Sequence, residues 1–226
     1  MKYVESPDRN IVTIEDPVEM VVPEFNQVAV QPVIDFTFAA ALRAILRQDP
    51  DIIMIGEIRD HETAQNEVQA ALTGHLVLST LHSNDTASSL TRLYDLGIEP
   101  YLVKSSLIGV MAQRLMRMIC PRCVAEIEYT AEELKAFGLA ASGPMRLKKG
   151  AGCDHCRSTG YHGRTGVHEV LEVSDGIRQL IDGKTPDTVI KEMARKDGMR
   201  TLKENAVRKM AEGITTFEEV LRLTAL

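Results

Sequence analysis

Two short apolar runs on either side of a helix-length segment constrain the fold most strongly. Residues 52–56 (IIMIG) and 76–81 (LVLSTL) are the runs, and the segment between them ends at Gly74. Aliphatic strands that alternate with helices are typical of a parallel α/β sheet. Ligands of such sheets bind outside the carboxyl ends of the strands. The two runs bring Glu57 and His82 to that edge.

A third strand is predicted over residues 10–15 (NIVTIE), where the Asp16-Pro17 pair ends it. If it runs parallel to the other two, Glu15 reaches the same edge. Glu15, Glu57 and His82 would then share one rim, which favours a phosphate or metal-assisted site. The plainer interpretation of either acid is a solvated carboxylate at a strand end, which is common.

His75 and His82 must be treated separately. Seven residues of extended chain, at ~3.3 Å each, place them roughly 20 Å apart, so one phosphate cannot contact both within a subunit. His82 lies at the carboxyl rim and can donate a hydrogen bond to a terminal phosphate. His75 lies at the opposite end, where a structural role or a neighbouring subunit is the expected environment.

Most of the remaining elements of the first half are predicted to be helices. Residues 18–32 are punctuated by prolines and indicate a surface loop or a short ribbon. The first predicted helix spans residues 36–48, and the second begins at an Asp60 cap and ends at Gly74. A third begins at an Asn84 or Asp85 cap and ends at Gly97, and a fourth begins at Pro100 and runs towards Met111.

The second half begins with cysteine-containing loops and ends in short helices. Thr130 and Glu133 form a capping-box pattern that opens a helix ending at Gly138. The Gly-rich and then alternating stretch at residues 157–173 predicts a β-ribbon. Short capped helices are expected from Ser174 onward, with a second capping box at residues 216–219.

All four cysteines of the chain lie in two C-x-x-C pairs, namely Cys120, Cys123, Cys153 and Cys156. Four thiolates with this spacing can close a tetrahedral Zn²⁺ site of structural type. The alternative is four reduced cysteines packed as small core residues. A redox pair fits less well, because the motif is duplicated and does not open a helix after a strand.

Composition excludes several classes of protein. A net charge of −6 and 4% aromatic residues disfavour a zinc-ribbon nucleic-acid binder. No apolar run is long enough for a transmembrane segment, and the first residues do not resemble a secretion signal, so a cytoplasmic location is expected. Four arginines could neutralise phosphate charge, although salt bridges with acids are the plainer expectation: Arg43, Arg47, Arg59 and Arg114.

Three motifs in this order resemble those of the type II secretion and type IV pilus assembly ATPases. NIVTIEDPVE resembles the aspartate box, LRQDPDIIMIGEIRD the Walker B segment, and TGHLVLSTLHSND the histidine box. CPRC, CDHC and GYHGRTGVHEVLEV resemble the tetracysteine zinc region of the secretion and pilus-extension members, which retraction members lack. The resemblance covers nearly the whole chain.

The resemblance implies a partial RecA-like α/β core at residues 1–115, a zinc-binding insertion at 116–172 and a helical C-terminal subdomain at 173–226. It implies ATP and Mg²⁺ as ligands, with Glu57 as the Walker B acid near Mg²⁺ and Glu15 as the candidate general base. His82 and His75 match the histidine-box residues. It further implies a homo-hexamer at the cytoplasmic face of the inner membrane, working with secretion or pilus platform proteins.

One family motif is missing. The sequence contains no G-x-x-x-x-G-K-[ST] loop, the Walker A segment that cradles phosphates. We therefore expect a C-terminal fragment that begins just after this loop, binds ATP very weakly and does not hydrolyse it alone. Its sheet should show an unpaired edge or a gap. The alternative function is a non-catalytic paralogue that docks on the secretion or pilus machinery through its zinc region.

Overall fold

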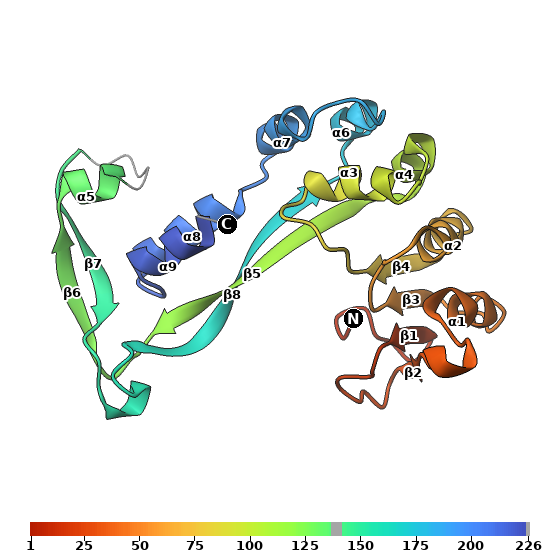
Figure 1. Cartoon of the computed structure of the whole chain (residues 1–226), viewed down its shortest axis with the longest axis horizontal. Coiled ribbons are helices and arrows are strands. Elements are labelled where there is room, and N and C mark those ends of the chain that lie inside the picture. Colours follow the sequence, from red (N-terminus) through yellow and green to blue (C-terminus); the bar gives the residue numbers. More distant parts are fainter. Residues whose placement is uncertain (137–141, 225–226) are drawn as a thin grey trace. The chain divides into compact units, whose positions relative to one another are not determined.

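The computed structural model describes residues 1–136 and 142–224, and in it four parallel strands form one sheet (Figure 1). The strands are β1 (Ile11–Glu15), β2 (Asn26–Ala29), β3 (Ile52–Ile55) and β4 (Leu76–Ser79), in the order β2-β1-β3-β4. All three pairings are parallel. The predicted parallel α/β core is confirmed, and its carboxyl ends lie on one edge.

Strand β2 differs from the loop or short ribbon predicted for residues 18–32. It adds to the sheet beside β1, with Thr13 in register with Gln27. Strands β1 and β3 pair directly, so no gap interrupts the sheet, while β2 and β4 each pair with one strand in the described part of the chain. A short 3₁₀ helix, η1 (Pro32–Ile34), follows β2.

Two helices pack on the sheet and on each other: α1 (Phe38–Ile45) and α2 (His61–Leu72). Thr37 caps α1 and, as predicted, Asp60 caps α2 by accepting from the Thr63 amide at 2.8 Å. The small and aliphatic faces of both helices meet the alternate side chains of β1 and β3. Burial of these side chains fixes the register of the strands, because a one-residue slip of a strand would turn its apolar side chains away from the helices.

The helices that follow are shorter than predicted. Helix α3 (Ser88–Asp95) has Asp85 one turn ahead, with its carboxylate accepting from the Ser88 amide at 3.0 Å. Helix α4 (Pro100–Ser106) ends before Met111, so the prediction there was wrong. Residues from Gly109 onward form strand β5 instead, and their side chains alternate in burial as those of a strand do.

Strand β5 (Gly109–Ile119) pairs with β8 (Tyr161–Glu172), and β6 (Val124–Tyr129) pairs antiparallel with β7 (Met145–Gly150). Within residues 157–173, where a β-ribbon is predicted, the structure has one strand, β8, and its partner is β5. Helix α5 (Ala131–Ala136) begins at the predicted capping box, where the Thr130 hydroxyl and Glu133 carboxylate bond each other's amides. Its predicted end at Gly138 lies outside the described residues. A 3₁₀ helix, η2 (Asp154–Cys156), lies between β7 and β8.

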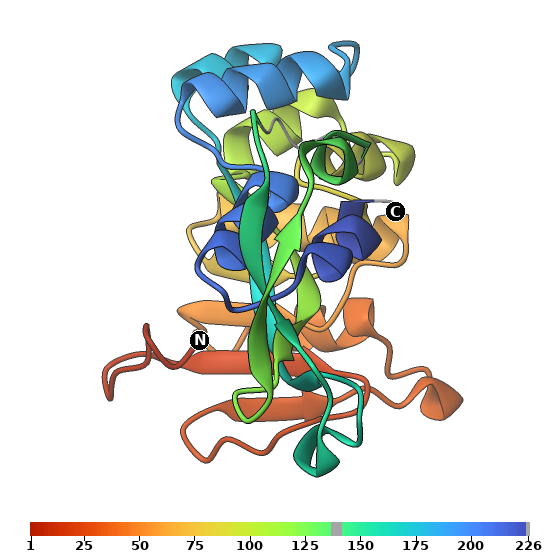
Figure 2. The same ribbon diagram turned by 90° about the vertical axis from the view of Figure 1, so that its left-hand side faces the viewer.

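Four helices complete the chain: α6 (Asp175–Leu180), α7 (Asp187–Lys196), α8 (Leu202–Ala211) and α9 (Phe217–Thr224). Helices α8 and α9 lie side by side (Figures 1 and 2). Together with strand residues Met116 and Val167 they bury a second apolar cluster, which includes Phe217.

The chain divides into two compact units. The first contains residues 1–109 and 173–193, and the second contains residues 110–172 and 194–226. The α6 segment and most of α7 therefore belong with the sheet, where Lys191 Nζ binds Asp85 Oδ2 at 2.8 Å. The division at residues 115 and 172 inferred from the family resemblance stays a prediction.

An ion pair between a half-exposed arginine and a buried carboxylate attaches α9 to β5 in the second unit. The Glu219 carboxylate is fully buried and accepts from the Arg117 amide at 2.9 Å and from its guanidinium at 2.6 and 2.8 Å. Arg117 also lies over the Tyr161 ring, 4.1 Å from its centroid. Only half of the predicted capping box forms, because the Glu219 amide donates to Thr216 while its carboxylate binds arginine.

The pair predicts a specific acid sensitivity. Burial opposes ionisation, but hydrogen bonds from Arg117 and Arg222 lower the pKa of Glu219 from 4.5 to about 2. Its contribution to stability is therefore present above pH 4.5 and is lost as the pH falls through 2. Glu219→Gln should lower the free energy of unfolding at pH 7 by roughly 3 kcal/mol and remove this part of the acid dependence.

Urea unfolding between pH 2 and 7 measures both effects. Glu128→Gln is the matched control, because it breaks an exposed pair with Arg146 and should cost less than about 1 kcal/mol. Equal losses in the two variants would contradict the role given to Glu219.

Candidate functional site

Hydrogen bonds tie together the loops at the carboxyl ends of β1, β3 and β4. The Gly56 amide donates to the Ile14 carbonyl at 2.8 Å, and the Ile58 amide donates to the Thr80 carbonyl at 2.9 Å. The Thr80 hydroxyl donates back to the Gly56 carbonyl at 2.5 Å. The three strand ends thus form one continuous rim, which holds the residues that follow each strand.

Glu57 lies at the centre of this rim. Its carboxylate accepts from Arg59 and lies 3.5 Å from Nε2 of His82. The hydrogen bond from Arg59 is the main reason that the pKa of Glu57 lies below its ordinary value. The Glu57 side chain is 20% exposed and that of His82 is 91% exposed, so an anchored carboxylate lies beside an exposed imidazole. The structure brings these two predicted residues together.

Glu15 ends the neighbouring strand β1 and has its own partners. Its Oε1 accepts from the Thr13 hydroxyl at 2.6 Å and from Gln27 Nε2 at 2.9 Å. The next residue, Asp16, raises the pKa of Arg59 in addition to the larger effect of Glu57. The two strand ends therefore share an electrostatic environment, although the two glutamates bind different groups.

His75 lies just before β4, at the amino end of the strand. Its Nδ1 is 2.9 Å from the Ala70 carbonyl and 3.2 Å from the Thr73 hydroxyl. The ring thereby joins the end of α2 to the start of β4. Whether His75 has a catalytic or a structural role stays a prediction, and so do the catalytic roles of Glu15, Glu57 and His82.

Sequence reasoning missed the groups that position Glu15. Thr13 is two residues earlier on the same strand, and therefore on the same face, which is a signal that periodicity offers. Gln27 carried no such signal, because its segment was expected to be a loop. Of the candidate arginines, Arg59 lies at the rim, whereas Arg43 forms a surface pair with Glu62.

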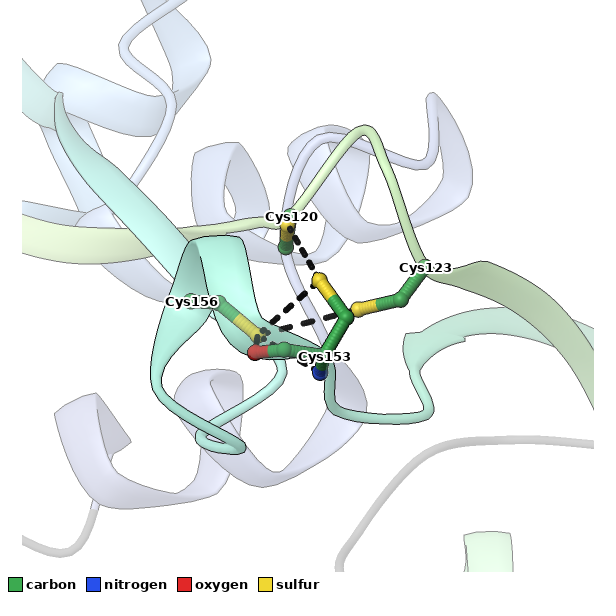
Figure 3. A group of neighbouring side chains, drawn as sticks. All are labelled: Cys120, Cys123, Cys153 and Cys156. Carbon is green, nitrogen blue, oxygen red and sulfur yellow. Dashed lines mark hydrogen bonds between the residues drawn. The ribbon is translucent and has the colours of Figure 1, made fainter.

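The four cysteine sulfurs converge in the second unit (Figure 3). All lie within 4.8 Å of one another, and three pairs are 3.7 to 3.9 Å apart: Cys120 with Cys153, Cys123 with Cys156, and Cys153 with Cys156. A disulfide requires about 2.05 Å. Ligands at about 2.3 Å from a tetrahedral ion are about 3.8 Å apart, so the cluster can hold a metal such as zinc.

Backbone amides surround these sulfurs. Gly152 donates to Cys123 Sγ at 3.3 Å, while Cys153 and Gly160 donate to Cys156 Sγ at 3.2 and 3.3 Å. Burial opposes ionisation of Cys156, yet the amides of Cys153 and Gly160 and the neighbouring thiols lower its pKa to about 6. Burial raises the pKa of the neighbouring Cys123, to which the Gly152 amide donates. Amide hydrogen bonds stabilise the thiolate form, which is the form that binds metals.

A buried acid lies beneath the rim. Glu67 on α2 is 5% exposed, and its Oε1 is 3.2 Å from Ser79 Oγ, which lies 3.1 Å from the Ile55 carbonyl. A hydroxyl has one proton and cannot donate to both groups. A protonated Glu67 resolves this, because it donates to Ser79, which then donates to Ile55. Burial raises the pKa of Glu67 to about 8.

Known structures define the class of fold. The crystal structure of the pilus retraction motor PilT with bound ADP matches with a TM-score of 0.66 and 26% identity, over 98% of this chain and 55% of that one. The Legionella pneumophila ATPase DotB matches with a TM-score of 0.70 at 21% identity, over 99% and 54%, and so shows the fold alone. These neighbours are ATPases that share a RecA-like P-loop core, and the chain has the fold of that class.

Sequence comparison then gives the family. The family model described as "Type II/IV secretion system protein" matches residues 1–222, and the chain belongs to this family. The type IV pilus assembly ATPase PilB of Thermus thermophilus is 51% identical over 226 residues, which are 99% of this chain and 25% of that protein. The type II secretion system ATPase E of Vibrio cholerae is 46% identical over 224 residues, or 99% and 44%.

A third relative, the type II secretion system protein HxcR of Pseudomonas aeruginosa, is 50% identical over 221 residues, which cover 98% of this chain and 44% of that protein. The chain thus spans between a quarter and less than half of these relatives. Among the helices of the described residues, none has the length and apolarity that a membrane span requires.

Glu67 should make stability fall as the pH rises. Its pKa in the folded chain, about 8, exceeds the ordinary value of 4.5 that the unfolded chain has. Between these two pH values the unfolded chain has lost the proton and the folded chain still holds it, so the free energy of unfolding falls as the pH rises. Glu67→Gln removes the effect, and the variant should gain on the order of 2 kcal/mol over the unmodified chain between pH 5 and pH 8.

Urea midpoints at the two pH values measure the difference. Glu62→Gln on the same helix is the control, since that side chain is exposed. A Glu67→Gln advantage that does not change with pH would show that the buried acid is not protonated in the folded chain.

Proposed function

We propose that this chain is the C-terminal ATPase-domain part of a motor that couples ATP hydrolysis to type II secretion or type IV pilus assembly. The observation that carries the proposal is the Glu57 carboxylate, fixed by Arg59 beside His82 at the carboxyl ends of parallel strands. The chain belongs to the type II/IV secretion system protein family, and its relatives are named as secretion and pilus assembly ATPases. This naming favours a motor over a docking module that works through its zinc region.

The rim residues have the chemistry for this reaction. Carboxylate oxygens are the ligands that Mg²⁺ takes in phosphoryl-transfer sites, and Glu57 presents one that is ionised and partly exposed. Magnesium would neutralise phosphate charge in the ATP complex. Glu15, held by Thr13 and Gln27, would orient or deprotonate the attacking water. His82 would donate to the terminal phosphate, and His75 would act at the other end of β4.

The intact protein would work as a homo-hexamer at the cytoplasmic face of the inner membrane, together with platform proteins of the secretion or pilus machinery. A nucleotide site would also need a Walker A loop, which these 226 residues lack, and the relatives are two to four times longer than the part matched. Glu57 and His82 would then complete the nucleotide site from their side of the rim.

ATP hydrolysis tests this assignment. The chain alone should release no phosphate from ATP, because a Walker A loop is absent from its sequence. Fusion behind the Walker A segment of a family member should produce measurable phosphate release in a colorimetric assay. Glu57→Gln in that fusion should lower the rate by about 100-fold, since the carboxylate acts on the reacting phosphate and its metal.

The control in the fusion is Glu62→Gln, an exposed acid on α2, which should leave the rate unchanged. ATP hydrolysis by the chain alone would contradict the expected dependence of activity on a Walker A loop. A well-folded fusion that binds ATP without hydrolysing it would favour the docking alternative.

We further propose that the four cysteines bind one structural Zn²⁺. Two ligands follow β5 and two belong to the η2 turn, so the ion would join segments about 30 residues apart in sequence. Four thiolates leave no open coordination position. The ion would therefore stabilise the second unit and take no part in the reaction.

Zinc content and thermal stability test the metal site together. The purified chain should contain about one zinc per molecule, and Cys153→Ser should lose it and lower the unfolding temperature. His155→Ala is the control, because this imidazole stacks on His162 with centroids 4.2 Å apart and lies within the same turn without being a ligand. Zinc loss in the histidine variant, or full stability in the serine variant, would contradict the four-thiolate site.

A further inference from the structure

A groove of about 500 Å³ lies in the second unit, between β8 and α8. Its lining comes from residues 165–168 and 170 of β8, residues 198–200 ahead of α8, and one face of α8 itself. Strand β8 and helix α8 pack against each other along this length (Figure 1). The volume falls within the range of about 300–1,000 Å³ that ligand sites have.

The charge of the lining is one-sided. Arg200, Arg208 and Lys209 supply three permanent positive charges, with His168 beside them, and none of the lining residues is acidic. The chain as a whole has 32 acidic residues and a net charge of −6. A strictly basic groove on an acidic chain favours an anionic ligand.

The basic side chains retain capacity to bind. The Arg200 guanidinium is exposed and has no partner among residues 1–136 and 142–224. Arg208 makes one exposed pair with Glu212, at 3.6 Å, which is weak enough to exchange. Lys209 donates once, to the Thr165 hydroxyl at 3.2 Å, and has further N–H donors.

The amino end of α8 is already occupied. The Leu202 amide donates to buried Glu169 at 3.1 Å, and the capping box of Thr201 with Glu204 satisfies the next groups. Recognition in the groove therefore depends on side chains. Asn205 contributes to its shape by donating to the His168 carbonyl at 2.7 Å.

The spacing of the charges selects the kind of anion. Arg208 lies six residues beyond the first residue of α8, which at 1.5 Å per residue is roughly 9 Å along the helix, and Arg200 lies two residues before that start. Positive charges spread along the groove in this way are matched better by several carboxylates on one chain than by a single phosphate group. In an extended peptide, side chains that point the same way recur every ~7 Å, so two or three carboxylates can meet these arginines.

We propose that this groove binds an extended acidic peptide segment of a partner protein. Arg200 and Arg208 pair with its carboxylates, and exposed Val170 packs against its aliphatic stems. The interaction belongs to the second unit and is independent of ATP hydrolysis at the rim. It would attach this unit to a partner by charge, with an affinity that falls as salt is added.

Calorimetric titration of the whole chain with a synthetic octapeptide of alternating Glu and Val tests the proposal. Binding should be measurable in 50 mM salt and weaker in 300 mM salt. The double variant Arg200→Gln/Arg208→Gln should weaken it by about fivefold or more. The matched control is Lys196→Gln/Lys203→Gln, which makes the same change in net charge at exposed positions outside the groove and should retain the affinity.

Amide NMR spectra locate the site, with shifts expected at His168 and Asn205 on peptide addition. If both double variants weaken peptide binding equally, the loss of affinity comes from the change in net charge, and the proposal is overturned. Absence of peptide binding would overturn it as well. Inorganic phosphate or ATP that binds the groove when the peptide does not would assign it to small anions instead.

Discussion

The structure of the first unit depends on direct hydrogen bonding between the parallel strands β1, β3 and β4. The pairing itself aligns the backbones, but the bonds beyond the strand ends, from Gly56 to Ile14 and between Ile58 and Thr80, extend the alignment into the loops. Loops are ordinarily the most variable part of a fold. Here they are fixed by the sheet, and an acid that follows β3 is held beside an imidazole that follows β4.

This rim combines groups of different exposure. The Glu57 carboxylate is anchored by Arg59, whose hydrogen bond holds its pKa low, whereas the His82 side chain is almost fully exposed. A preorganised charge costs no rearrangement when a ligand arrives, while an exposed side chain adapts to it. Glu67 lies beneath the rim and differs from Glu57 in its ionisation, because burial raises the pKa of Glu67, whose Oε1 lies 3.2 Å from Ser79 Oγ.

Strong periodicity made β1, β3, β4, α1 and α2 predictable from sequence, and the same pattern located Glu57 and His82. Strand β2 was missed because NQVA is short and polar, and its stability comes from pairing with β1. The helix predicted from Pro100 towards Met111 included the first residues of strand β5, which begins at Gly109. Pairing with β8, which is distant in sequence, makes this stretch a strand.

Side-chain partners were less predictable than elements. Cys-x-x-Cys spacing carries its own geometry, so the convergence of four sulfurs follows from sequence. The binding of Glu219 to Arg117 does not, because the same residue also satisfies a local capping pattern with Thr216. The tertiary ion pair prevails over the local box, since three hydrogen bonds from one arginine stabilise the buried carboxylate more than the single amide of Thr216 would. Local rules thus located the helix start, and only the fold determined where its acid is used.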